Sequence, residues 1–275
     1  MQGNRRGIWK LILLYLSLGM VSLIILYPIL LMLRISLISP EEFFRPDKAL
    51  LIGPGWTLEH WKGVFGSGLL WPALYKSLYI ATVTTVMAVL LAAPAAYVIS
   101  RTGRRWKYIL IMSLFISRMF PEVGIALPVS VRFLSWNLVD TYLGIVLAHL
   151  IKVLPYVAWI LVGTFEAIPR SLEEASFVDG AGKLATLRRI VFPVSMPGIA
   201  VAAMLVWLES WNEFTYALYL TVSENTLPLQ TYYYLNRGGI FNSAAYATII
   251  TVPVIVMTFI LQRHLKAGML AGGVK

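Results

Sequence analysis

The chain of 275 residues contains no cysteine, and charged residues make up only 13% of it. Without cysteine there is no disulfide bond, no thiolate nucleophile and no cysteine-ligated metal site. The three histidines, His60, His149 and His264, are far apart in the sequence and form no ligand motif. We therefore expect no metal site, and the preferred hypothesis is a chain that binds no cofactor and catalyses no reaction itself.

The sequence also lacks the patterns of intramembrane enzymes. Its aspartates, Asp47, Asp140 and Asp179, all fall in predicted loops, whereas a membrane aspartyl protease needs two facing carboxylates. The motifs Gly-x-Ser-Gly, for membrane serine proteases, and His-Glu-x-x-His, for metalloproteases, are both missing. An intramembrane enzyme is thus a disfavoured alternative.

Hydrophobic residues dominate the composition, at 59%. A soluble domain of this size could not bury so much apolar surface, so a membrane protein is indicated. The net charge of +10 comes from short basic clusters beside the apolar runs, an arrangement that sets membrane topology and does not indicate nucleic-acid binding. The first run follows Arg5, Arg6 and Lys10 and is too long for a signal-peptide core, so we expect a retained span.

The apolar runs predict an all-α integral membrane protein with a single domain, 1–275. A membrane-spanning helix needs roughly 20 apolar residues. The predicted spans are at about 11–33, 72–100, 108–133, 142–165, 198–220 and 244–261. Within the third span, Pro121 should bend or break the helix. Ser39-Pro40 and Thr57-Leu58 are expected to start short helices outside the spans.

Small residues recur at helical spacing along the second span. They are Ala81, Thr85, Ala88, Ala92 and Ala96. Such a stripe lets helices approach closely in lipid, so it predicts a packing seam. A merely alanine-rich helix is an equally good interpretation from sequence alone.

The most polar internal segment is the loop 166–197, between the fourth and fifth spans. Pro169 suits a first helical turn, and Ser171 with Glu174 has capping-box spacing. Gly180 can adopt the left-handed conformation that ends a helix. We expect a short helix, a bend at Gly180 and a second short helix that Pro193 stops. Leu172, Ala175 and Ser176 should share one face of the first helix.

Basic residues predict the orientation. The N-terminus, the turn 101–107, the loop 166–197 and the C-terminal tail together carry 14 of them, against seven on the opposite side. The positive-inside rule then places both termini and the polar loop in the cytoplasm of a multi-pass plasma-membrane protein.

The polar loop resembles the coupling-loop motif of the membrane subunits of ABC importers. That motif is Glu-Ala-Ala, three residues, Gly, nine residues, and Ile-x-Leu-Pro. Glu174-Ala175-Ser176, Gly180 and Ile190 through Pro193 have this spacing, with Ser176 in place of an alanine and Phe192 in place of the leucine. The resemblance implies a cytoplasmic coupling helix docked on an ATPase. The residues it implies for this contact are Leu172, Glu173, Glu174, Ala175, Ser176, Asp179, Gly180, Ala181, Ile190 and Pro193.

Further motifs are similar to the sugar-importer branch, in particular the smaller permease of maltose-type transporters. They are Ala96-Tyr97 with Arg101, Met119-Phe120-Pro121, Trp211-Asn212-Glu213-Phe214, Thr226-Leu227-Pro228 and the ending Ala271-Gly272-Gly273-Val274-Lys275. The resemblance implies the type I ABC importer architecture and ATP-driven uptake of a carbohydrate or polyol-type solute. It also implies a heterodimer with a second permease, two ATPase subunits that bind ATP and Mg²⁺, and an external solute-binding protein. In some relatives the tail, here Gly272, Gly273, Val274 and Lys275, reaches the ATPase subunits.

Several polar residues within the predicted spans are candidates for a translocation path. They are Arg118, Glu122, Lys152, Glu209, Asn212 and Glu213. Charges inside a span are costly and usually face a partner or a water-filled path. Arg118 and Glu122 are four residues apart and could form a structural ion pair or a gate. Lys152 is expected to have a carboxylate partner within the bundle, which could be Glu122, Glu209 or Glu213. The same residues would suit an ion-coupled secondary transporter, the main alternative, but such a carrier has no use for a coupling loop.

Overall fold

The computed structural model describes residues 2–45, 55–237 and 239–272, and these residues are almost entirely helical. The chain forms two compact units. Within the described residues, the extended pairing consists of one antiparallel bridge between Ile38 and Trp56. The expectation of an all-α protein is therefore confirmed.

The first unit comprises residues 1–70 and 231–251. It contains α1 (Gln2–Leu37), α2 (Pro40–Phe43), α3 (Glu59–Gly66) and the beginning of α13 (Ile240–Gly272). Both short helices begin where the sequence predicts. Nε2 of His60, on α3, lies 3.0 Å from the carbonyl oxygen of Ile38. The His60 ring stacks on the ring of Phe241, with the two centroids 4.9 Å apart. These contacts hold α3 against the end of α1 and the start of α13.

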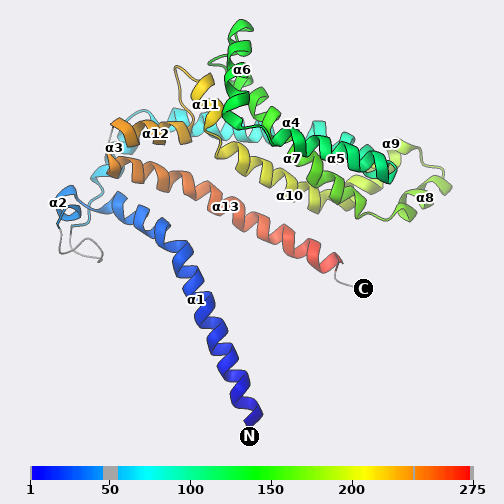
Figure 1. Ribbon diagram of the computed structural model, residues 1–275, viewed down its shortest axis with the longest axis horizontal. Coiled ribbons are helices and arrows are strands. Elements are labelled where there is room, and N and C mark those ends of the chain that lie inside the picture. The colour runs from blue at the N-terminus through cyan, green and yellow to red at the C-terminus, as the bar shows by residue number, and fades with distance from the viewer. Residues whose placement is uncertain (1, 46–54, 238, 273–275) are drawn as a thin grey trace. The chain divides into compact units, whose positions relative to one another are not determined.

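The second unit comprises residues 71–230 and 252–275. Its helices are α4 (Leu70–Arg101), α5 (Arg104–Arg118), α6 (Glu122–Ser135), α7 (Tyr142–Glu166), α8 (Arg170–Val178), α9 (Lys183–Thr186), the π-helical turn η1 (Leu187–Val191), α10 (Phe192–Trp211), α11 (Thr215–Leu220) and α12 (Leu227–Arg237), the last of which continues into the first unit. In Figure 1, α5, α7 and α10 run alongside one another, with α8 and α9 at one end.

Five helical stretches of the described residues are long and apolar enough to cross a membrane. They are Lys10–Leu37, Leu70–Arg101, Tyr142–Glu166, Lys183–Trp211 and Ile240–Ile260. The pair α5 and α6, bent by 82° at the break before Glu122, makes a sixth if the two helices are counted as one broken span. The bend confirms the expected effect of Pro121, which cannot donate a backbone hydrogen bond.

The predicted fifth span differs from the observed one. The predicted span covers about 198–220. The observed helix begins well before residue 198, ends at Trp211 and is followed by the separate helix α11. The Glu213 carboxylate explains the break, because it accepts hydrogen bonds from the backbone N–H groups of Tyr216 (2.9 Å) and Ala217 (3.2 Å). A carboxylate at that place satisfies the first donors of a new helix.

α7 is the central helix of the second unit. Of the residues in its most apolar stretch 56% are buried, against 33% for α4. The small-residue stripe of α4 faces the same core, with Ala81, Ala88 and Ala96 fully buried. The stripe is therefore a packing seam, which settles the choice that the sequence left open.

The turn between α6 and α7 is joined to the segment that follows α11. Oδ1 of Asp140 accepts hydrogen bonds from the backbone N–H groups of Val222 (3.0 Å) and Ser223 (3.1 Å). Burial alone would raise the pKa of Asp140, but these hydrogen bonds, together with the nearby charge of Lys76, outweigh it and hold this pKa below its ordinary value. The ionised carboxylate thus stabilises the connection.

Candidate functional site

The polar loop forms a helix, a bend and a second helix, as predicted. α8 ends at Val178, and Gly180 follows with a φ of 83°, which an L-residue adopts only under strain. The second helix, however, is not stopped by Pro193. α9 passes through η1 directly into α10, where Pro193 occupies the first turn. A first-turn proline removes no helical hydrogen bond, and the wider π-helical turn precedes it.

The start of α8 also differs from the prediction. Pro169 is the residue before the helix, and no side chain caps it, so Ser171 and Glu174 form no capping box. The helix buries Glu173 and Ser176 and leaves Leu172 exposed. Leu172, Ala175 and Ser176 are all in this helix, but Leu172 and Ala175 are exposed whereas Ser176 is buried.

The opposite side of α8 and the bend is exposed and partly apolar. Phe177, Val178 and Leu184 have exposed fractions of 43%, 88% and 77%. Glu174, Ala175, Asp179 and Gly180 are also exposed. Ala181 and Ile190 are half-buried. Phe177 and Val178 precede the stretch Lys183–Trp211, and Leu184 lies in its first turn. Three exposed apolar side chains around one bend form a surface suited to docking in a protein groove. We call Phe177, Val178 and Leu184 the apolar tip.

The buried side of α8 is tied to the end of α4 by Glu173. Its Oε1 pairs with the Arg101 guanidinium, whose Nε donates at 2.8 Å, and its Oε2 accepts from the Tyr97 hydroxyl at 2.7 Å. The tie is reciprocal, because Arg170 Nη2 donates to the Arg101 carbonyl at 3.3 Å. We call Tyr97, Arg101 and Glu173 the α4–α8 clamp. Sequence reasoning placed Glu173 with the ATPase contacts and missed this arrangement, although Tyr97 and Arg101 share one helix face.

A second buried hydrogen bond joins the two arms of the bend. The hydroxyl groups of Ser176, on α8, and Thr186, on α9, are 2.8 Å apart. Both residues are buried, at 5% and 1% exposure. Ser176 therefore does more than replace an alanine of the motif, since an alanine could not make this bond.

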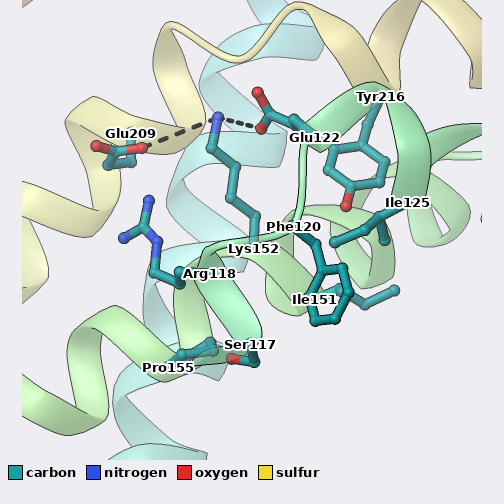
Figure 2. Close-up of a pocket in the computed structure, with 10 residues that line it drawn as sticks. All are labelled: Ser117, Arg118, Phe120, Glu122, Ile125, Ile151, Lys152, Pro155, Glu209 and Tyr216. Carbon is teal, nitrogen blue, oxygen red and sulfur yellow. Dashed lines mark ion pairs between the residues drawn. The ribbon is translucent and has the colours of Figure 1, made fainter. Parts of the chain in front are cut away.

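A cavity of about 560 Å³ lies beside the break between α5 and α6. It is lined by Ser117, Arg118, Phe120, Glu122, Ile125, Ile151, Lys152, Pro155, Glu209 and Tyr216. Figure 2 shows Arg118 and Lys152 directed into the same space as the carboxylates of Glu122 and Glu209. Four of the six candidate path residues thus meet here, joined by Phe120 and Tyr216, which sequence reasoning did not select.

Lys152, on α7, has the carboxylate partner that the sequence requires. Its Nζ lies 2.6 Å from Glu122 Oε1 and 3.9 Å from Glu209 Oε2 (Figure 2). The ion pair expected between Arg118 and Glu122 is not formed in the structure. The helix breaks between them, Glu122 turns to Lys152, and the Arg118 guanidinium lies over the Tyr156 ring at 5.1 Å. A bend of 82° removes the shared helix face on which the expected pair depended.

The two remaining candidates lie elsewhere. Glu213 is 2% exposed, and its Oε2 lies 3.1 Å from Nε2 of His149, while Nδ1 of His149 lies 2.7 Å from the Ser210 hydroxyl. Asn212 is exposed and donates to the Leu208 carbonyl. Neither residue lines the cavity. Glu213 thus caps the start of α11 and, through His149, joins it to α7.

Two further expectations concern the tail and metals. Gly272 is the last residue of α13, and Gly273, Val274 and Lys275 lie outside the described residues. Among the described residues, no group of three or more His, Asp or Glu side chains is placed to hold a metal ion.

The chain was compared with known proteins. Residues 88–270 match the family model described as "Binding-protein-dependent transport system inner membrane component". The chain is 33% identical to the trehalose transport system permease protein SugB of Mycobacterium tuberculosis over 91% of this chain and 92% of that one. It is 29% identical to the trehalose/maltose transport system permease protein MalG of Thermococcus litoralis over 98% and 99%.

Among solved structures, the fold matches a chain of a bacterial ABC transporter involved in the import of the acidic polysaccharide alginate. The TM-score is 0.73 with 21% identity, covering 92% of this chain and 95% of that one. The family match covers most of the chain and agrees with the all-helical fold and with the bent loop around Gly180. The chain belongs to the family of binding-protein-dependent transport system inner membrane components, the permeases of ABC transporters.

Proposed function

We propose that this chain is a permease subunit of an ATP-driven ABC importer that carries a carbohydrate or polyol-type solute across the plasma membrane. The single observation that supports this most is the bent loop around Gly180, which exposes an apolar tip around the bend. An importer needs such an element to receive force from a separate ATPase. The sugar-transport relatives support a carbohydrate solute.

The proposed assembly has a second permease, two cytoplasmic ATPase subunits and an external solute-binding protein. The ATPase subunits hold ATP and Mg²⁺, so this chain hydrolyses nothing. The basic residues support cytoplasmic termini and a cytoplasmic loop. The apolar tip would enter a groove of one ATPase subunit, and the tail around Gly272 would approach the same partners.

The charged cavity is the proposed point of solute contact in this subunit. Its four charged residues, Arg118, Glu122, Lys152 and Glu209, comprise two cations and two carboxylates and therefore balance. They offer both donors and acceptors, and Phe120 and Tyr216 add aromatic surface. A volume of about 560 Å³ is in the range of small-molecule pockets. This combination suits a neutral polyhydroxylated solute better than an anionic one.

Affinity capture tests the assignment. A tagged chain, purified from its own cells in mild detergent, should retain an ATPase whose hydrolysis rises when the binding protein and solute are added to reconstituted vesicles. Glu174→Lys reverses an exposed charge at the docking surface and should weaken the capture. The matched control, Glu59→Lys, reverses an exposed charge on α3, outside the loop, and should leave capture unchanged. A wild-type chain that captures no ATPase would refute the proposal.

A further inference from the structure

We infer that Glu173 is a positioning residue for energy coupling: through the α4–α8 clamp, it transmits ATPase movement from the docking helix α8 to the spanning helix α4. The inference rests on the proposed function, because it requires an ATPase at the apolar tip. It assigns Glu173 a task different from docking. A residue that docks must face outward, whereas Glu173 is 7% exposed and faces its own chain.

The bonding of Glu173 is complete without a partner protein. Oε1 is engaged by Arg101 and Oε2 by Tyr97. Hydrogen bonds that include an ionised group are shorter and stronger than neutral ones. The adjacent Glu174 is exposed, so the two neighbouring glutamates have different surroundings. One is available to a partner and the other is committed to α4.

The clamp also has a rigid base. Arg101 Nη2 donates to the Ile168 carbonyl, at the end of the segment that leads into α8, at 3.4 Å. Tyr97 meets Phe165 of α7 edge to face at 5.8 Å, and Phe165 is fully buried. The clamp therefore joins α8 to α4 at a point where α4 is itself packed on the central helix α7.

This geometry gives α8 two distinct surfaces. The apolar tip is exposed, and Glu173 and Ser176 hold the other side to α4 and to α9. A force applied at the tip reaches α4 through a charge-assisted link from a helix of nine residues. Packed elements with discrete arrangements carry such coupling, and a polar link of fixed geometry moves them together. Weakening the clamp should leave the docking surface in place but reduce the movement that docking transmits from α8 to α4.

The test measures docking and coupling separately in vesicles that contain the captured complex. Glu173→Gln keeps the shape of the side chain and removes its charge. We expect wild-type ATPase capture and basal hydrolysis, but a fall of about tenfold in solute transported per ATP hydrolysed, the size expected when a charged hydrogen-bonded pair is broken. Tyr97→Phe, which removes one hydrogen bond, should show a smaller fall. Arg101→Gln combined with Glu173→Gln should be no worse than the single variants, since the partners act as one unit.

Lys107→Gln is the matched control. It breaks the pair between Lys107 Nζ and Glu166 Oε1, at 2.6 Å, which joins α5 to the end of α7 and does not involve α8. We expect a wild-type transport ratio. A wild-type ratio in Glu173→Gln would overturn the inference. If Glu173→Gln does not assemble, Tyr97→Phe decides, and a wild-type ratio there would overturn it too. Failure of the wild-type chain to capture an ATPase would instead refute the proposed function.

Discussion

Replacing Lys152 with methionine should destabilise the second unit by leaving two carboxylates without their cation. Loss of one partner from a fully buried pair costs about 3–5 kcal/mol. Here the side chains of Lys152, Glu122 and Glu209 are 20%, 37% and 39% exposed, so solvent screens part of the effect. We expect a loss of about 1–3 kcal/mol, after reducing the buried-pair value for this exposure.

The distances also rank the two carboxylates. The Coulomb attraction is inversely proportional to distance, so Glu122 at 2.6 Å attracts Lys152 about 1.5 times as strongly as Glu209 at 3.9 Å in the same dielectric. Only the shorter contact is also within hydrogen-bond range. Glu122→Gln should therefore lower stability more than Glu209→Gln. Combining Lys152→Met with Glu122→Gln should recover part of the loss, because removal of both partners leaves one fewer uncompensated charge.

The assay is thermal unfolding of the purified complex, together with solute uptake in vesicles. For a chain of this length, Tm changes by about 2–4 °C per kcal/mol. The control is Lys62→Met, an exposed change on α3 that should move Tm by less than about 1 °C. Equal, negligible shifts for Lys152→Met and Lys62→Met would refute the reasoning and mean that the ammonium is solvated without its partners.

Three further predictions address the loop, the topology and the turn between α6 and α7. Gly180→Val should reduce solute-stimulated ATP hydrolysis and Gly180→Asn should do so less, because a Cβ here meets nothing within 4 Å and only the positive φ opposes valine; equal activity of both variants and the wild type would contradict this. Single cysteines at Ser67 and Ser223 should react with an impermeant reagent outside intact cells and one at Ser171 should not; labelling at Ser171, or protection at both other sites, would overturn the orientation. Asp140→Asn should lower Tm more at pH 7 than at pH 3, because a carboxylate whose pKa is lowered in the folded state stabilises the fold above its unfolded-state pKa, near 4, and this stabilisation declines as the pH falls toward the folded-state pKa; an equal loss at both pH values would argue against the ionised carboxylate.

Local chemistry predicted several features of the fold and the site. Pro121 breaks the helix because it has no backbone N–H to donate. Gly180 adopts a positive φ that other residues adopt only with strain. The partner of Lys152 could be expected because a lone ammonium within a span is costly. The small-residue stripe on α4 could be recognised in the sequence, but only the structure shows that it is buried in the core. These predictions depend on one residue or one helix face.

The misses depended on how separate segments meet. The buried face of α8 could not be read from the sequence, because Glu173 faces inward through its contacts with Tyr97 and Arg101 on the separate helix α4. Pro193 was expected to end a helix, but the π-helical turn before it lets the chain continue. Arg118 and Glu122 share a face only in an unbroken helix. The contribution of Tyr216 to the cavity depends on α11, which exists because Glu213 starts a new helix.

The energy source of uptake tests the central claim most directly. The complex captured by the wild-type chain would be placed in vesicles with its solute-binding protein outside, and carbohydrate uptake would be measured with ATP inside or with an imposed ion gradient. The account predicts uptake that requires hydrolysable ATP and persists when ion gradients are collapsed. Uptake by this chain alone, driven by an ion gradient in the absence of ATP, would contradict it.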